Sequence, residues 1–180
     1  MVLRRVTFRM SRREWHLVWG PPGRAGARPQ FSQILPELLV GEYLVPADAR
    51  WLRDECGVTA VLSLQDDPDL SAKGLHLPAL EKSYADHGIR FDRVKIADGD
   101  NEMLLARVDD AVGIVDAALT RGDRLYLHCN AGMNRAPTIA IAYLHSHRGL
   151  SLMEARTFLR ERRHCVPYMS VLEARYGTRS

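Results

Sequence analysis

The chain contains 180 residues, of which 46% are hydrophobic, and its formal net charge is +3. This length suits one globular domain and leaves little room for a second. Residues 1–30 contain seven arginines and one glutamate, a balance of +6, so the rest of the chain is mildly acidic at −3. A mildly acidic body gives no case for nucleic-acid binding, and no run approaches the ~18 apolar residues that would span a membrane.

The basic segment, residues 1–30, is expected to stand apart from the domain. Arginines interrupt MVLRRVTFRMSRREW throughout, so this stretch lacks the unbroken apolar centre of a secretory signal. A disordered tail or a misassigned start is the leading interpretation, with a targeting segment or a basic docking arm as alternatives. The stretch GPPGRAGARP at 20–29 is typical of a linker, which places the expected domain at 31–176.

The three cysteines, Cys56, Cys129 and Cys165, lie far apart and form no CxxC pair. This spacing argues against a disulfide framework and against a structural zinc site. We therefore expect a reducing compartment and a cytoplasmic protein, in which a thiol can remain free to react.

In the first half of the domain, three apolar runs predict strands. They are ILPELLVG, which Pro36 breaks into short pieces, VTAVLSL at 58–64 and IRFDRVKI at 89–96. Two further segments have a proline where a helix can begin and a glycine where it can end. They are PADARWLRDECG at 46–57 and LPALEKSYADHG at 77–88.

In the second half, the residues at 102–122 place apolar side chains on one helical stripe. RLYLH at 124–128 predicts a short buried strand, and APTIAIAYLHSHRG at 136–149 predicts a helix rich in small residues. Ser151 and Glu154 form the capping box of one more helix. Strands that alternate with helices indicate a single α/β domain, with a central and mainly parallel sheet flanked by helices.

The connection between the strand at 124–128 and the next helix carries the candidate site. Cys129 ends the strand, Arg135 opens the helix, and five residues lie between them. The backbone amides of this loop can curl into a concave nest to which the helix adds its positive end. Gly132 permits the unusual backbone angles of such a curl. The nest and the forked guanidinium of Arg135 suit a phosphate dianion.

The same dipoles and the same cation favour the thiolate of Cys129, which is the nucleophilic form. In-line attack of this thiolate on phosphorus would give a phosphocysteine, which water then hydrolyses. The leaving oxygen needs a proton, and the sequence ADGDNE after the strand at 89–96 offers Asp98, Asp100 and Glu102. We choose Asp98 because it lies closest to the strand end, with Asp100 as the open alternative.

The other loop residues are expected to bind the substrate phosphate. They are His128, Asn130, Ala131, Gly132, Met133 and Asn134, and His128 is also expected to orient the loop. The other two cysteines fail the same test, because the sixth residue after each is Leu62 or Val171 and not an arginine. Cys165 is interpreted as a buried small side chain, or alternatively as a redox partner of Cys129.

The stretch HCNAGMNRA is similar to the H-C-x2-G-x2-R signature of cysteine-dependent dual-specificity phosphatases, and residues 31–176 resemble the order of elements in that fold. The resemblance implies a hydrolase in which Cys129 is the nucleophile, Arg135 binds the phosphate and Asp98 is the general acid. It also implies that no metal and no cofactor is used.

Within that family, three stretches resemble the glucan-phosphatase branch (plant starch-excess phosphatases and laforin) and related bacterial phosphatases. They are LQDDPDL at 64–70, AGMNRAP at 131–137 and RRHCVP at 162–167. Two positions depart from family patterns. Ala136 replaces the Ser or Thr whose hydroxyl helps the sulfur leave, and Gly99 follows the acid where the branch has an aromatic residue. Tyr43 and Tyr168 could still offer stacking surfaces for a sugar.

The leading hypothesis is therefore a phosphatase that acts on phosphorylated proteins, on Tyr, Ser or Thr. The alternative substrate is a phosphorylated glucan or small sugar, and a phosphoinositide is less favoured because the loop lacks lysine. Two other classes stay open: an inactive phosphate-binding module and a sulfur transferase. The sequence predicts no membrane or nucleic-acid partner and leaves the oligomeric state undetermined.

Overall fold

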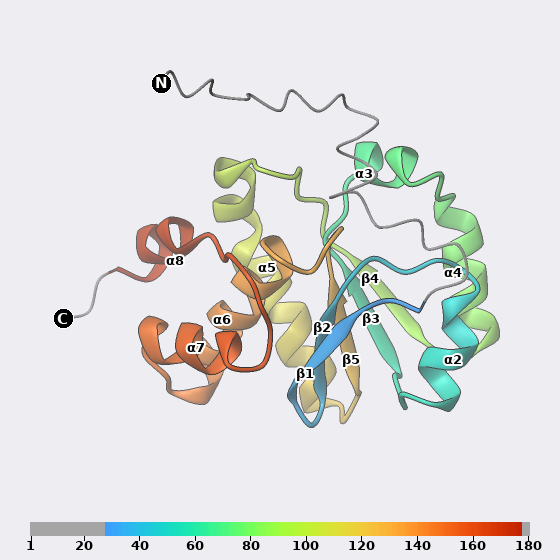
Figure 1. The fold of residues 1–180 in the computed structure, drawn as a ribbon, viewed down its shortest axis with the longest axis horizontal. Coiled ribbons are helices and arrows are strands. Elements are labelled where there is room, and N and C mark those ends of the chain that lie inside the picture. The colour runs from blue at the N-terminus through green and yellow to red at the C-terminus, as the bar shows by residue number, and fades with distance from the viewer. Residues whose placement is uncertain (1–27, 178–180) are drawn as a thin grey trace, which may run out of the picture.

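The computed structural model describes residues 28–177. The basic segment predicted at residues 1–30 therefore lies outside the described residues, apart from residues 28–30. One five-stranded sheet has helices on both faces (Figure 1). The strands are β1 (Phe31–Leu35), β2 (Leu38–Gly41), β3 (Ala60–Ser63), β4 (Arg90–Arg93) and β5 (Leu125–His128). The described helices are α2 (Asp48–Asp54), α3 (Asp67–Ala72), α4 (Leu77–Asp86), α5 (Asn101–Thr120), α6 (Arg135–Arg148), α7 (Leu152–Arg160) and α8 (Met169–Tyr176).

The sheet has the order β1-β2-β5-β3-β4, and only the edge pair β1–β2 is antiparallel. Every residue of the central strand β5 is buried, as expected for a parallel strand covered on both faces. His128 at its end is in register with Gly41 of β2 and Ser63 of β3. The carboxyl ends of the parallel strands therefore meet at one edge of the sheet, where α/β folds bind ligands.

Two hydrophobic cores lie on opposite faces of the sheet because successive side chains of a strand point to opposite sides. Leu125 and Leu127 of β5 join the larger core, which α5, α6, α7 and α8 cover. Tyr126 between them joins the smaller core, which α2, α3 and α4 cover. The two sets of helices are separated by the sheet in Figure 1.

A close backbone contact fixes β2 against the ring of Tyr126. A Cβ atom at Gly41 would lie 2.2 Å from the hydroxyl oxygen of Tyr126 and 2.6 Å from the Cβ of Phe31. That hydroxyl donates a hydrogen bond of 3.0 Å to the Glu42 carbonyl. Only glycine fits at position 41, directly beside the strand end that leads into the candidate site.

Most predicted elements are confirmed, including the helices within 46–57 and 77–88 and the capping box at Ser151. The strand predicted over 89–96 is shorter, at Arg90–Arg93, although Val94 still donates its backbone N–H to Ser63 at the end of β3 and Ile96 donates to the next residue, Leu64. α3 and α8 were not predicted, because six and eight residues are too short to show a hydrophobic period. Within residues 28–177, no helix has the length and apolarity to cross a bilayer.

Candidate active site

The loop from Cys129 to Asn134 joins β5 to α6 at the carboxyl edge of the sheet, as the sequence predicts. Cys129 is buried, and Arg135 is the first residue of α6. Gly132 has φ +63°, and a Cβ atom there would lie 2.4 Å from the Gly41 carbonyl oxygen. Its left-handed backbone and this close contact both require glycine at the middle of the loop.

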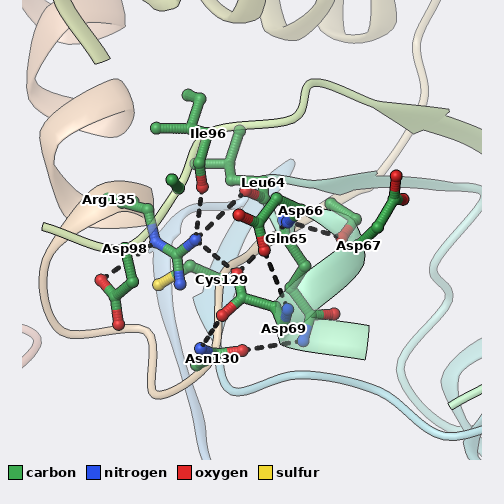
Figure 2. A network of polar contacts seen from close by, with 12 residues as sticks. Leu64, Gln65, Asp66, Asp67, Asp69, Ile96, Asp98, Cys129, Asn130 and Arg135 are labelled. Carbon is green, nitrogen blue, oxygen red and sulfur yellow. Dashed lines mark hydrogen bonds and ion pairs between the residues drawn. The ribbon is translucent and has the colours of Figure 1, made fainter. Parts of the chain in front are cut away.

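The guanidinium of Arg135 is almost fully buried, with 1% of the residue exposed, and one of its nitrogens is held by three oxygens. Nη1 donates to Asp69 Oδ2 at 2.6 Å, to the Ile96 carbonyl at 2.6 Å and to the Leu64 carbonyl at 3.4 Å. Figure 2 shows this group beside the sulfur of Cys129. Burial alone would lower the pKa of Arg135, but the charge of Cys129 and the bond to Asp69 outweigh burial and raise it.

The other edge of the same guanidinium is open toward the loop. Nε and Nη2 are buried, and neither donates a hydrogen bond to any residue in the described range. The carboxylate of Asp98 lies 3.4 Å from Nε. A buried donor without an acceptor is costly, and two such donors on one edge of a planar guanidinium match two oxygens of a phosphate. The open edge is therefore suited to an oxyanion above Cys129.

Asp69 anchors Arg135 and was not among the predicted site residues. Its second oxygen accepts a hydrogen bond of 2.6 Å from the Asn130 side chain, whose own oxygen accepts one of 2.8 Å from Gln65 (Figure 2). Burial alone would raise the pKa of Asp69, but the hydrogen bonds from Arg135 and Asn130 hold it below the ordinary value. The carboxylate therefore stays charged opposite the guanidinium.

The first turn of α3, the helix that carries Asp69, is stabilised by a capping box and by two ion pairs. Asp66 and Asp69 form a capping box at the start of α3. Asp67 pairs with Arg93 and with Lys95, each at 2.8 Å. The Asp-x-x-Asp spacing within LQDDPDL was the signal that could have revealed this helix start. The stretch was interpreted only as a family resemblance.

Of the three predicted candidates for the acid, only Asp98 contacts Arg135. Asp100 instead caps α5, because its side chain accepts the Met103 backbone N–H at 2.8 Å. Glu102 is exposed in the first turn of that helix. The half-buried Tyr168 lies near Asp98, and burial together with that negative charge raises the pKa of its phenol. The geometry therefore separates Asp98 from the two other acids.

The outer side of the loop is held by the segment that follows α7. Arg163 donates from Nε to the Gly132 carbonyl at 2.6 Å and from Nη2 to the Ala131 carbonyl at 3.1 Å. Val166 donates its backbone N–H to the Met133 carbonyl at 2.8 Å. In a planar trans peptide the N–H points opposite to the carbonyl, so the amides that follow these three carbonyls point to the inner side of the loop. Arg163 was not among the predicted site residues.

The remaining predicted residues either hydrogen-bond to the backbone around the loop or are buried. His128 is buried and donates from Nδ1 to the Cys129 carbonyl at 3.1 Å. Asn134 donates from its side chain to the Val166 carbonyl at 2.8 Å, so its amide nitrogen holds the loop rather than facing the nest. Cys165 is buried, and burial raises the pKa of its thiol. Tyr43 is only 6% exposed, so its ring is not available to stack on a sugar.

No group of three or more His, Cys, Asp or Glu within residues 28–177 could hold a metal ion. Residues 46–173, which contain the loop, Asp69 and Asp98, match the dual specificity phosphatase catalytic domain. The chain belongs to the dual specificity phosphatase family. The predicted family and the predicted α/β phosphatase fold are thereby confirmed.

Two relatives of this phosphatase-family chain are similar over most of its length. An amyloplastic phosphoglucan phosphatase, DSP4 of Castanea sativa, is 33% identical over 149 residues, which cover 80% of the chain and 39% of that protein. Dual specificity protein phosphatase 2 of Homo sapiens is 30% identical over 134 residues, 74% of the chain and 38% of that protein. The chain therefore spans less than half the length of either relative.

Among solved structures, PTPMT1 in complex with PI(5)P superimposes with a TM-score of 0.69 at 23% identity, over 79% of this chain and 90% of that one. At this identity the likeness concerns the fold. It agrees with the sheet and helices described above, which place Cys129, Arg135 and Asp98 in one site.

Proposed function

We propose that this chain is a cysteine-dependent phosphatase that hydrolyses phosphomonoesters, with proteins phosphorylated on Tyr, Ser or Thr as its substrates. The observation that carries the proposal is the open edge of Arg135, where two buried nitrogens donate no hydrogen bond to the described residues and Nε has only the ion pair of 3.4 Å with Asp98. It lies beside the sulfur of Cys129 at the carboxyl edge of the sheet (Figure 2). Family membership supports the same chemistry.

In the first step, the Cys129 thiolate attacks phosphorus as the bond to the leaving oxygen breaks, and a phosphocysteine forms. Arg135 and the inward amides of the loop stabilise the charge on the phosphoryl oxygens. Asp98, in contact with Arg135, gives its proton to the leaving oxygen. In the second step, water attacks phosphorus, the Asp98 carboxylate takes the proton of that water, and the S–P bond breaks to return the thiolate and release inorganic phosphate.

Ala136 bears on the second step. It is fully buried next to Arg135 and supplies no hydroxyl to the departing sulfur. We therefore propose that hydrolysis of the phosphocysteine limits turnover. Rapid mixing with an aryl phosphate is expected to give a burst of phenol, followed by a slower steady rate. A time course that is linear from the start would show that the first step limits the reaction instead.

Release of phosphate from p-nitrophenyl phosphate tests the proposal directly. Cys129→Ser is expected to reduce the rate to background, because a serine hydroxyl is a far weaker nucleophile than a thiolate. Cys56→Ser is the matched control. Cys56 lies near Arg124, which precedes β5, whereas Cys129 follows β5, so the two cysteines lie at opposite ends of that strand. Full activity in Cys129→Ser would refute the proposed nucleophile.

A phosphorylated glucan is the second candidate substrate, and the similarity to the phosphoglucan phosphatase of Castanea sativa favours it. Phosphopeptides and phosphorylated amylopectin should be compared in one assay, with Asp98→Ala as the control for background hydrolysis. Faster phosphate release from amylopectin than from the phosphopeptides would show that the glucan, and not a protein, is the preferred substrate. Tight phosphopeptide binding without turnover would instead support an inactive phosphate-binding module.

A further inference from the structure

Lys73 is a partly desolvated cation beside the candidate active site, and the mechanism above does not use it. It caps the carboxyl end of α3, the helix that carries Asp69. Its ammonium nitrogen lies 5.3 Å from the centre of the Tyr43 ring. Within residues 28–177, this ammonium donates no hydrogen bond and forms no ion pair. The residue is partly buried, so its charge lacks full hydration, and no carboxylate in the described range pairs with it directly.

The position of Lys73 is tied to the phosphate loop through its neighbours. Tyr43 donates its backbone N–H to the Asn130 carbonyl at 3.0 Å, and Asn130 is the residue after Cys129. Asp69, one turn before Lys73 on α3, binds both Asn130 and Arg135. Burial lowers the pKa of Lys73, and the charges of Asp69 and Asp98 only partly oppose this effect. Lys73 therefore lies in the electric field of the two carboxylates that contact Arg135.

The other cations around the loop already have acceptors. Arg93 and Lys95 pair with Asp67, and Arg163 donates to the loop carbonyls. Arg135 is held by Asp69 on one edge and faces the reacting phosphate with the other. Among the described cations around the loop, Lys73 is thus the one that is free to contact a second part of the substrate.

We propose that Lys73, supported on the Tyr43 ring, binds a second acidic group of the substrate, so that the enzyme prefers phosphopeptides with an acidic residue next to the phosphorylated one. This inference rests on the proposed function. A half-desolvated ammonium gains most from a negatively charged partner, because it is not fully solvated beforehand. An uncharged sugar would gain less, and the Tyr43 ring that could have stacked on it is buried.

The test compares two phosphotyrosine peptides that differ only in flanking residues, acidic in one and neutral in the other. We expect the unmodified protein to show a kcat/KM about fivefold higher for the acidic peptide at low salt, and a smaller ratio at high salt. Lys73→Met should bring the ratio close to one, and Lys73→Glu should reverse it. Lys82→Met is the matched control, because Lys82 is exposed on α4 and pairs with Asp86. It should keep the ratio of the unmodified protein.

The inference and the proposed function fail in different ways. If p-nitrophenyl phosphate is hydrolysed but the peptide ratio is one, or does not change in Lys73→Met, the role of Lys73 is overturned and the phosphatase stands. If no substrate is hydrolysed, the affinities of the acidic and neutral peptides for the Cys129→Ser variant test the contact with Lys73. Tighter binding of the acidic peptide that Lys73→Met abolishes supports the contact, and equal binding of both peptides overturns it. Faster turnover of phosphorylated amylopectin than of either peptide would also overturn it.

Discussion

Asp69 and Arg135 form a buried ion pair of 2.6 Å that connects α3 to the first residue of α6, 66 positions later in the chain. Asp69→Asn should lower kcat/KM for an aryl phosphate by about 10²-fold, because the guanidinium loses the anchor that fixes its position. It should also cost roughly 3 kcal/mol of unfolding free energy, since a buried charge is left without its partner. Steady-state kinetics and urea unfolding measure the two effects.

The control for Asp69→Asn is Asp67→Asn on the same helix. Asp67 is exposed and pairs with the exposed Lys95 and with the mostly buried Arg93, which also donates to the Gln65 carbonyl. Its loss should cost no more than about 1 kcal/mol. Equal activity in the two variants would show that Asp69 does not position Arg135.

Arg163 should act on the loop through the carbonyls that it binds. Arg163→Met is expected to raise the inhibition constant of inorganic phosphate about tenfold, because the loop amides lose their fixed orientation. Arg163→Lys should recover part of the loss, since one ammonium can replace only part of a forked guanidinium. The neighbouring Arg162→Met is the control, because Arg162 donates to the Phe158 carbonyl and not to the loop. A phosphate affinity that is unchanged in Arg163→Met would contradict the positioning role.

Replacement of two glycines by alanine should change the stability of the fold in opposite directions. Gly41→Ala should destabilise the fold by about 1–3 kcal/mol, because its Cβ would overlap the Tyr126 hydroxyl. Gly113→Ala lies on α5 with nothing within 4 Å of the added atom, and it should stabilise the fold by up to about 1 kcal/mol. Thermal unfolding of the two variants gives the signs. Stabilisation by Gly41→Ala would mean that β2 can move away from Tyr126.

Asp123 lies outside the active site, and its titration should make the stability of the fold depend on pH. Burial alone would raise the pKa of Asp123, but hydrogen bonds from Thr59 and Arg121 and the charge of Arg90 lower it. A carboxyl group whose pKa is lower in the folded state stabilises the fold fully above its unfolded value of about 4, and this stabilisation is lost as the pH falls through the folded value. Asp123→Asn should therefore be less stable than the unmodified protein at neutral pH. The difference should shrink below about pH 4.

Urea unfolding at several pH values measures this difference. The exposed Glu81→Gln on α4 serves as the control. A deficit of Asp123→Asn that is the same at acidic and at neutral pH would show that titration of Asp123 does not contribute to stability.

Those parts of the site whose residues lie close together in the chain could be predicted from the sequence. Cys129, Gly132 and Arg135 lie within seven consecutive residues, and the flanking strand and helix have clear patterns. Asp98 could be chosen because it follows a strand that ends at the same edge of the sheet. These predictions depend on spacing and topology, which a single sequence displays.

The partners of the loop could not be predicted in the same way. Asp69 contacts Arg135 from 66 positions away and Arg163 contacts Gly132 from 31 positions away, and each contact depends on side-chain geometry that no local pattern encodes. Asp69 also lies on a helix too short to show a hydrophobic stripe. Tyr43 was expected to offer a stacking surface for a sugar, whereas it is only 6% exposed and the Lys73 ammonium lies 5.3 Å from the centre of its ring.

The contact between Asp98 and Nε of Arg135 has a consequence for the order of events in a catalytic cycle. A carboxylate oxygen already lies 3.4 Å from the edge that an incoming phosphate needs. The arriving dianion must therefore compete with Asp98 for that guanidinium and displace it toward the oxygen that is about to leave. Substrate entry would in this way free the Asp98 carboxylate beside the leaving oxygen, where it takes up a proton from solvent before it acts as the acid, so that phosphate binding at Arg135 precedes proton delivery.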